Sequence, residues 1–507
     1  MSATLPNCVG SKTSLGVCNK CRKTAPATYE NRDERIYLVK HCEVCGDTEA
    51  LVSSSAKRWQ EKRDLCGYAE ESARNCSLNC TSCNHGKPPS LVFLDVTNRC
   101  NMNCPICLAN ITAMGFQFDP PMSYFEKVFK AVAAIQPRPK IQLFGGEPTV
   151  RRDLVDIIRL AKSYGLSARV VTNGLKMADE EYCKNLLATG TQLMFAFDGR
   201  HPDIYSKIRK NPKTLEQKIA GLDNVRKYRK SKVTIMCCVG LGVNDEYMAD
   251  TIEFLHDRRD YIAALDLIPL VETWGPEQVE AGNTTIDDVE NIMANAIPGT
   301  EFIPAGMLYH IRTLKENFDL GRLTFGGAHP NCESVTALVS DGERYRPLSN
   351  YLRCSFSSLA KQIIDIDQEM GRKLPASLWS KLFGKKGRQF VLASKLFFLL
   401  RRSINFKEVF GGNATARTIK ILFGLLRGKK MKNLLRRHTK CQSLLRIIVL
   451  PFEEPDNVES ERLVECPAAF AYEHPMTRDI QFMPVCSWCI YKDSILRLTS
   501  ERYGVAS

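Results

Sequence analysis

The chain between residues 91 and 269 alternates short apolar runs with longer amphipathic segments. Short apolar runs rich in β-branched residues predict buried strands, whereas apolar residues that recur three and four positions apart predict helices. The runs that predict strands cover 91–96, 140–144, 168–172, 192–197, 232–241 and 263–268. The segments that predict helices cover 122–136, 153–164, 179–188, 215–230 and 246–258. This alternation predicts an α/β fold built from parallel β/α units.

Chemically distinctive residues directly follow the first two apolar runs. The first run is followed by three cysteines, Cys100, Cys104 and Cys107. The second run leads into a loop of Gly145, Gly146, Glu147 and Pro148. Three thiolates hold three corners of a four-iron cluster, so one iron remains open to a small chelating ligand. Both groups end a strand, where a β/α barrel builds its active site. The alternative is a structural zinc knuckle beside an unrelated glycine turn.

This pair of motifs resembles the radical S-adenosylmethionine (SAM) superfamily. The resemblance implies a partial (β/α)6 TIM-type barrel in which the methionine end of SAM completes the [4Fe-4S] cluster. It also implies that the loop at 145–148 holds the methionine amine through backbone oxygens and the glutamate. Later strand ends supply further candidates for SAM contact, namely Asn173, Asp198 and Asn244. Asn-Gly and Asp-Gly are also common turn dipeptides, so these three candidates are less specific.

The N-terminal segment carries two C-x2-C pairs, formed by Cys18, Cys21, Cys42 and Cys45. In a zinc ribbon or a rubredoxin-like site each pair forms a knuckle, and the four sulfurs make a tetrahedron around one metal ion. Zinc and iron both accept four sulfur ligands, so the sequence predicts a mononuclear Zn or Fe site and does not choose between them.

Two further cysteine groups predict auxiliary clusters. The first group contains Cys66, Cys76, Cys80 and Cys83, and its last three members repeat the C-x3-C-x2-C spacing. No apolar run precedes it, so we interpret it as an auxiliary [4Fe-4S] site with Cys66 or His85 as fourth ligand, or else as a second zinc site. The second group, near the C-terminus, contains Cys466, Cys486 and Cys489, with Cys332 preferred to Cys354 as the fourth ligand.

Length and composition define the general class of protein. The chain has 507 residues and is 44% hydrophobic, which is typical of a globular protein with two or three domains. No apolar run reaches the roughly eighteen residues of a membrane-spanning helix, and the N-terminus does not look like a signal peptide. We therefore expect a cytoplasmic protein. In that compartment its 21 cysteines indicate metal ligands rather than disulfides.

Positive charge is concentrated between residues 381 and 446. This segment has 18 Lys or Arg and one acid, Glu408, so its net charge of +17 exceeds the +14 of the whole chain. Apolar Ile419, Leu422, Leu425 and Leu426 are expected to share one helical face. The neighbouring basic residues are Arg417, Lys420, Arg427, Lys429, Lys430, Arg436 and Arg437. The pattern favours a peripheral helix at an anionic membrane surface. The alternatives are nucleic-acid binding and a solvated basic face.

Two cysteine segments close together in the sequence resemble the paired cysteine segments of the tetraether lipid synthase family, which includes members described as pterin methyltransferases. These segments are NCSLNCTSCNHG and LVFLDVTNRCNMNCPICLAN. At Ile106 the chain departs from the aromatic residue that is common before the third cysteine of the superfamily motif.

The chain is predicted to divide into six segments. They are a rubredoxin-like or zinc-ribbon-like site (1–60), an auxiliary-cluster segment (61–90), the barrel (91–310), the start of a C-terminal auxiliary domain (311–380), a basic amphipathic helical module (381–450) and a C-terminal auxiliary-cluster segment (451–507).

The resemblance implies an enzyme that generates a 5′-deoxyadenosyl radical and abstracts hydrogen from an unactivated carbon. Our first hypothesis is that it joins lipid alkyl chains by carbon–carbon bond formation. The second is methyl transfer to a pterin or another small molecule, and the third is a non-catalytic iron–sulfur scaffold at a membrane or nucleic acid. An enzyme of this class needs an electron donor such as ferredoxin or flavodoxin.

Overall fold

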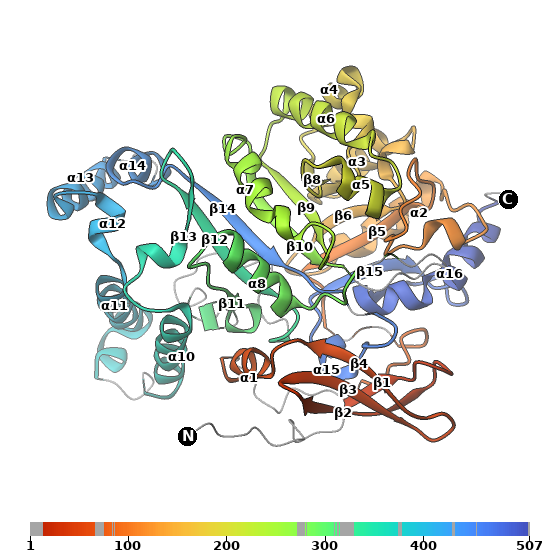
Figure 1. The fold of residues 1–507 in the computed structure, drawn as a ribbon, viewed down its shortest axis with the longest axis horizontal. Helices are drawn as coiled ribbons and strands as arrows, with labels where there is room; N and C mark the ends of the chain where they lie inside the picture. Colours follow the sequence, from red (N-terminus) through yellow and green to blue (C-terminus); the bar gives the residue numbers. More distant parts are fainter. Residues whose placement is uncertain are drawn as a thin grey trace.

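The computed structural model describes residues 14–504 except 66–75, 84, 86, 271–278, 280, 309, 312–313, 315–328, 374–377, 428–430 and 453. Figure 1 shows three parts, namely a small N-terminal sheet, a large barrel-like body and a helical lobe at the opposite end from the C-terminus. None of the described helices is both long enough and apolar enough to cross a membrane.

The N-terminal part is a four-stranded antiparallel sheet with the order β1-β2-β3-β4. Its elements are β1 (Ser14–Val17), β2 (Thr24–Arg32), β3 (Arg35–Cys42), β4 (Gly46–Ser53) and the helix α1 (Ala56–Asp64). Trp59 from α1 packs on Tyr29 with ring centroids 5.1 Å apart, which closes a small core beside the sheet. Gly46 adopts φ +72°, which allows the chain to turn directly after the second cysteine pair.

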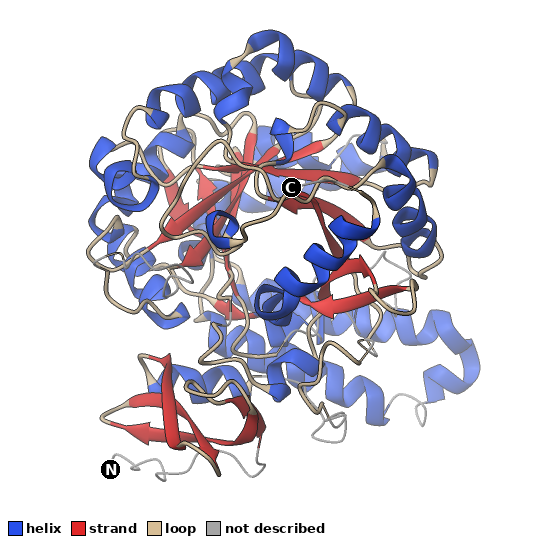
Figure 2. Ribbon diagram, turned by 90° about the vertical axis from the view of Figure 1, so that its right-hand side faces the viewer, coloured by secondary structure: helices blue, strands red, loops and turns tan. Residues whose placement is uncertain are grey.

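The central body contains the six parallel strands that the sequence predicts. They are β5 (Leu91–Thr97), β6 (Lys140–Gly145), β7 (Ala168–Thr172), β8 (Gln192–Ala196), β9 (Val233–Val239) and β10 (Ile262–Pro269). The helices between them are α2 (Met122–Ala133), α3 (Leu154–Ser163), α4 (Glu180–Ala188), α5 (Pro202–Arg209), α6 (Thr214–Tyr228) and α7 (Met248–His256). Figure 2 shows the strands curving around an inner side with helices outside. The predicted open barrel is therefore confirmed, although α5 was not predicted.

Strands from the C-terminal part extend this sheet at both edges. Beyond β10 lie β14 (Ser443–Val449), β12 (Ser334–Ser340) and β11 (Ile303–Pro304), and β13 (Tyr345–Pro347) pairs with β12. Beyond β5 lie β15 (Ala468–Glu473) and β16 (Ile480–Pro484). A turn at Asp341-Gly342 joins β12 to β13. The prediction of a helical module up to residue 450 is wrong at its end, because residues 443–449 form β14, which pairs with β12 and, through residues 446–449, in parallel with β10.

The segment between β13 and β14 forms the helical lobe. Its helices are α10 (Phe356–Lys373), α11 (Leu378–Ser403), α12 (Phe406–Phe410), α13 (Ala414–Leu426) and α14 (Met431–His438). A small core of Phe410, Ile421 and Leu434 holds α12, α13 and α14 together. Ile419, one of the residues expected on a shared apolar face of this segment, is 58% exposed, whereas Ile421 is buried.

Three further helices connect the parts. They are α8 (Ile286–Ala296), α15 (Ser460–Val464) and α16 (Val485–Arg502). Lys62 of α1 is fully buried and forms ion pairs with Asp287 at 2.6 Å and Glu290 at 3.0 Å on α8. Tyr29 donates a hydrogen bond to Glu459 at 2.8 Å, directly before α15. These buried contacts fasten the N-terminal sheet to the barrel.

Candidate active site and metal centres

The cysteine loop and the glycine loop lie against each other at the carboxyl ends of β5 and β6. Gly146 N–H donates to the Thr97 carbonyl at 2.8 Å, and Glu147 N–H donates to the Arg99 carbonyl at 2.8 Å. A Cβ on Gly145 would lie 2.1 Å from Thr97 O, and one on Gly146 would lie 2.3 Å from Arg99 O. Both glycines are therefore required, because only a residue without a side chain lets the loop contact the strand that leads to Cys100.

The Glu147 carboxylate fixes the next strand end. It accepts hydrogen bonds from Thr149 N at 3.0 Å, Thr172 Oγ1 at 2.8 Å and Asn173 N at 2.6 Å. Burial raises the pKa of Glu147, and these donors act in the opposite direction. The carboxylate thus holds the ends of β6 and β7 in one arrangement.

Asn173, whose contact with SAM stays a prediction, lies beside the cysteine loop. Its Nδ2 donates to Asn101 Oδ1 at 2.8 Å and is 4.0 Å from Cys100 Sγ. Of the three cysteines, Cys100 is exposed, and Cys104 and Cys107 are half-buried. The strand ends thus present three thiols and an amide to one place.

Asp198 is fully buried and does not present a free carboxylate. Arg209 binds it through two hydrogen bonds of 2.9 Å, and Cys238 N donates to it at 3.1 Å. Burial opposes ionisation, yet the Arg209 guanidinium lowers the pKa of Asp198. Asn244 is also used internally, since its Nδ2 donates to the Asp198 and Cys238 carbonyls at 3.0 and 2.8 Å. Direct SAM contact by Asp198 or Asn244 stays a prediction.

Sequence reasoning missed two cations near Cys104, the part-buried Arg209 and the fully buried Lys218. Lys218 Nζ donates to the carbonyls of Asn173 and Ala196, both at 2.6 Å. Burial lowers the pKa of Lys218 to about 8. Both cations lie close enough to Cys104 to interact with its charge. They therefore place positive potential where a cluster of thiolates would carry negative charge.

The predicted N-terminal metal site has the expected geometry. The sulfurs of Cys18, Cys21, Cys42 and Cys45 all lie within 4.8 Å of one another. The backbone N–H of Cys21 contributes most to lowering the pKa of Cys18 to about 6, which favours the thiolate that binds metal. Four sulfurs on two knuckles fit a tetrahedral ion, either zinc or iron.

The first auxiliary trio lies at the N-terminus of α16, where Cys486 and Cys489 are located. Cys80 Sγ is 3.3 Å from Ser487 Oγ, and His85 Nε2 is 3.1 Å from the Cys466 carbonyl. Two of the predicted cysteine groups, distant in sequence, thus meet in space, and Cys76 and Cys83 belong to the same loop. Cys66 lies outside the described residues. The ligands of any auxiliary cluster stay predictions.

Helix α16 also contacts the principal cysteine loop. Trp488 Nε1 donates to Asp95 Oδ2 at 2.7 Å, and Lys492 Nζ donates to the Ala109 carbonyl. Cys489 is close enough to Cys107 to interact with its charge. A single helix therefore lies between the two predicted cluster regions.

Cys332 and Cys354 have different surroundings. Arg462 Nε lies 3.3 Å from Cys332 Sγ. Cys354 is half-buried directly before α10. A further group, His329, Glu459 and Glu461, has the spacing of a possible metal site. Arg63 pairs with Glu461 at 2.8 Å, so this group also has a structural role between the N-terminal sheet and α15.

The inner face of the sheet carries polar side chains that the sequence analysis did not single out. Gln142 of β6, Asp266 of β10 and Glu333 before β12 are each buried, and each has a side-chain oxygen without a hydrogen-bond partner among the described residues. Burial raises the pKa of Asp266 to about 6 and that of Glu333 to about 8. The charges of Arg169 and Arg446 act on Asp266. For Gln142 and Asp266 the only sequence signal was a polar residue inside an apolar run.

Comparison with known proteins agrees with this site. Residues 94–255 match the Radical SAM superfamily, and residues 11–54 match the HMPTM N-terminal zinc ribbon domain. The chain therefore contains a radical SAM domain, with the ribbon before it. The chain is 26% identical over 501 residues to a 7,8-dihydro-6-hydroxymethylpterin dimethyltransferase from Methanocaldococcus jannaschii. The matched region covers 94% of this chain and 93% of that relative.

Other similarities are confined to part of the chain. A GTP 3',8-cyclase from Marinobacter nauticus is 29% identical over 190 residues, covering 37% of this chain and 56% of that enzyme. The structure of Streptococcus suis SuiB bound to S-adenosylmethionine covers 55% of this chain and 69% of that chain, at 11% identity and a TM-score of 0.36. At this TM-score the structural likeness does not bear on function.

Proposed function

We propose that this radical SAM protein joins lipid alkyl chains by forming a carbon–carbon bond. The observation that carries the proposal is an exposed apolar surface on the helical lobe. Of the eleven large apolar side chains that stand exposed in the described part of the chain, seven belong to α11, α13 and α14. Large exposed apolar surfaces mark sites for proteins or membranes, and this one is rich in Lys and Arg.

The position of the lobe connects this surface to the barrel. Its chain leaves the sheet after β13 and returns in β14, which pairs with the barrel strand β10. A lipid bound by the lobe would therefore lie on an element continuous with the radical SAM sheet. This arrangement supports a protein that works from the cytoplasm as a peripheral protein at a membrane surface.

The roles of the site residues follow from their positions. Cys100, Cys104 and Cys107 would ligate the [4Fe-4S] cluster, and Gly145 to Pro148 with Asn173 would hold SAM. When bound, this pair supplies a 5′-deoxyadenosyl radical, given one electron from a donor such as ferredoxin or flavodoxin. Glu147 orients the loops, and Arg209 and Lys218 stabilise negative charge at the cysteines. No side chain of the chain needs to act as a general acid or base.

Methyl transfer to a pterin is the second candidate. It is favoured by the similarity to the Methanocaldococcus jannaschii enzyme over almost the whole chain. It is also favoured by the oxygens of Gln142, Asp266 and Glu333 that have no hydrogen-bond partner within the described part of the chain. These oxygens could accept hydrogen bonds from a ring with several N–H groups. A saturated alkyl chain offers no donors to these oxygens.

One anaerobic experiment separates the candidates. Reconstituted protein is incubated with SAM and a reductant, with either membrane lipid extract or 6-hydroxymethyl-7,8-dihydropterin, and the products are analysed by mass spectrometry. We expect lipids whose mass has fallen by two hydrogens for each new carbon–carbon bond. Methylated pterin without lipid change would instead establish the second candidate. Cys104→Ala is the control in both arms.

A further inference from the structure

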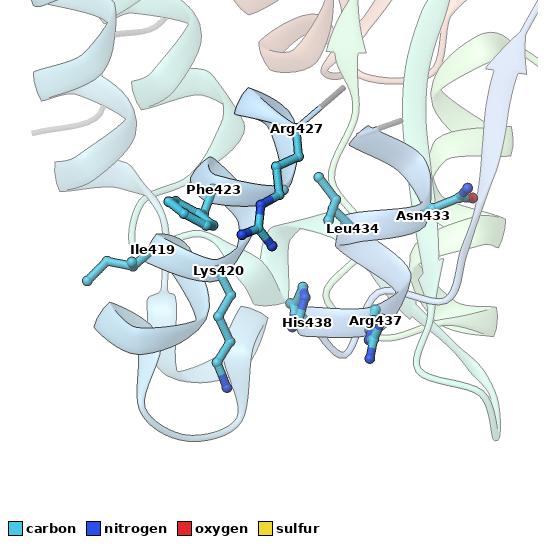
Figure 3. A pocket seen from close by; sticks show the side chains of 9 residues that line it. Ile419, Lys420, Phe423, Arg427, Asn433, Leu434, Arg437 and His438 are labelled. Carbon is cyan, nitrogen blue, oxygen red and sulfur yellow. The ribbon is translucent and has the colours of Figure 1, made fainter. Parts of the chain in front are cut away.

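A cationic pocket lies between α13 and α14 in the helical lobe. Its volume is about 350 Å³, and its lining consists of Ile419, Lys420, Phe423, Gly424, Arg427, Asn433, Leu434, Arg437 and His438. In Figure 3 the side chains of Arg427 and Lys420 extend from one helix while Arg437 and His438 lie on the other. The pocket belongs neither to the barrel nor to any cysteine group.

The pocket is built by the packing of the two helices. A Cβ on Gly424 would lie 2.4 Å from Leu434 Cδ2, so glycine at this position lets α14 approach α13 closely. Leu434 is buried together with Ile421 and Phe410. The helices are therefore fixed relative to each other, and the side chains on their outer surfaces hold their spacing.

The exposed residues of the pocket combine positive charge with apolar surface. Lys420, Arg427 and Arg437 are exposed, and the guanidinium of Arg427 lies over the Phe423 ring, 4.4 Å from its centroid. Ile419 and Phe423 are 58% and 54% exposed. Glu408, the only acid between residues 381 and 446, lies 3.9 Å from Lys440, which does not line the pocket. Several cations beside exposed apolar groups match an anion attached to an apolar chain.

We propose that this pocket binds the phosphate headgroup of an anionic phospholipid in a bilayer, with Ile419 and Phe423 inserted at the level of the upper acyl chains. Its biological purpose rests on the lipid function proposed above, since docking would bring the barrel to its substrate. Basic side chains near an anionic leaflet attract it, and buried apolar side chains add to this attraction. A nucleic-acid backbone offers the same phosphates but leaves Ile419 and Phe423 in water.

Vesicle binding tests the proposal without turnover. The full-length reconstituted protein is titrated with phosphatidylcholine vesicles with and without phosphatidylglycerol. The triple variant Lys420→Gln, Arg427→Gln, Arg437→Gln should bind the anionic vesicles about 100-fold more weakly, since each charge contributes roughly fivefold. The matched control, Lys57→Gln, Lys184→Gln, Lys213→Gln, removes three exposed charges from other surfaces and should bind like wild type. Circular dichroism confirms that both variants fold.

A second variant tests the apolar part. Ile419→Ser with Phe423→Ser keeps every charge and should still weaken vesicle binding, whereas inorganic phosphate should not displace wild-type protein from vesicles. Equal binding by the basic triple variant and its control overturns the proposal. So does tight RNA binding that is lost in the triple variant while vesicle binding persists. If vesicle binding behaves as expected but wild type converts no lipid, the proposed function fails and the docking site stands.

Discussion

At the scale of single residues, the candidate active site contains buried charged side chains, and most of them have hydrogen-bond or ion-pair partners. Glu147 has several hydrogen-bond donors, and Asp198 has the bidentate Arg209. The cysteines, Glu147 and Asn173 could be predicted because each stands in a recognisable motif after a strand. Arg209 and Lys218 could not, because a single basic residue on an amphipathic helix has the same pattern whether it is solvated or turned inward.

Removing Arg209 should strongly destabilise the protein. In Arg209→Met the fully buried Asp198 loses its ion pair, and an uncompensated buried charge costs roughly 3–5 kcal/mol. Arg200→Met is a matched control, because the Arg200–Asp250 pair is partly exposed and contributes about 1 kcal/mol or less. Urea unfolding at neutral pH measures both values. Equal losses in the two variants would contradict a special role for the buried pair.

The two cysteine trios should differ in their effect on SAM cleavage. Cys104→Ala removes a predicted cluster ligand from the loop after β5 and should abolish 5′-deoxyadenosine formation. Cys80→Ala changes the auxiliary loop at α16 and should leave some uncoupled cleavage. Chromatography of the nucleoside products after reduction with dithionite measures both. The opposite result, in folded and iron-loaded protein, would reverse the assignment of the two cysteine groups.

Glu333 should make stability depend on pH. Its pKa is raised to about 8, above the value of about 4.3 for an unfolded chain, so it stabilises the fold while protonated and loses this contribution as the pH rises toward 8. Glu333→Gln should therefore be more stable than wild type by roughly 5 kcal/mol at pH 9 and by only about 1 kcal/mol at pH 5. The exposed Glu343→Gln is the control. Parallel pH profiles of thermal unfolding for Glu333→Gln and wild type would refute this.

At the scale of elements, the local pattern of apolar and polar residues was sufficient to predict the strands and most helices of the barrel, but not the strands at the edges of the sheet. The six predicted strands match β5 to β10 to within two residues at either end, because each buried strand has its own apolar run. Helix α5 was missed since it has only eight residues, yet it carries Arg209. Its start, Pro202 in the first turn, was the available signal.

The edges of the sheet could not be predicted because their partners are remote in sequence. Ala468–Phe470 of β15 pair with Leu91–Phe93 of β5, and Arg446 of β14 pairs with Ala264 of β10. Nothing in an apolar run specifies which distant strand it joins. The same holds for the auxiliary cysteines, whose approach to α16 depends on this pairing.

The N-terminal sheet should depend on its metal. Cys42→Ser removes one of four sulfurs that lie within 4.8 Å, so the protein should lose one equivalent of zinc or iron. Hydrogen exchange in β2, β3 and β4 should accelerate, whereas β5 to β9 should keep their protection. Cys441→Ser, outside this group, is the control. Unchanged metal content and exchange in Cys42→Ser would exclude a structural metal at this site.

At the scale of the whole molecule, the chain folds back so that its first and last parts both contact the barrel. The N-terminal part contacts α8 through an ion pair from α1 and contacts the segment before α15 through a hydrogen bond from β2. Helix α16 lies between the cysteine loops at 76–83 and 100–107. The predicted metal regions thus lie on parts of the chain that contact the barrel or each other directly. Electron transfer between neighbouring centres would need such proximity.

The metal content of the whole protein should exceed that of one cluster. Three cysteine groups outside the principal loop are available, and two of them meet at α16, so anaerobic reconstitution should give more than four irons per chain. Replacing Cys76, Cys80 and Cys83 together by Ala should remove about one four-iron cluster while leaving the cluster that cleaves SAM. Iron, zinc and sulfide analysis, with electron paramagnetic resonance of the reduced protein, provides the measurement. A wild-type protein with only four irons and no zinc would rule out the multi-centre arrangement, and an unchanged iron content in the triple variant would place the auxiliary cluster elsewhere.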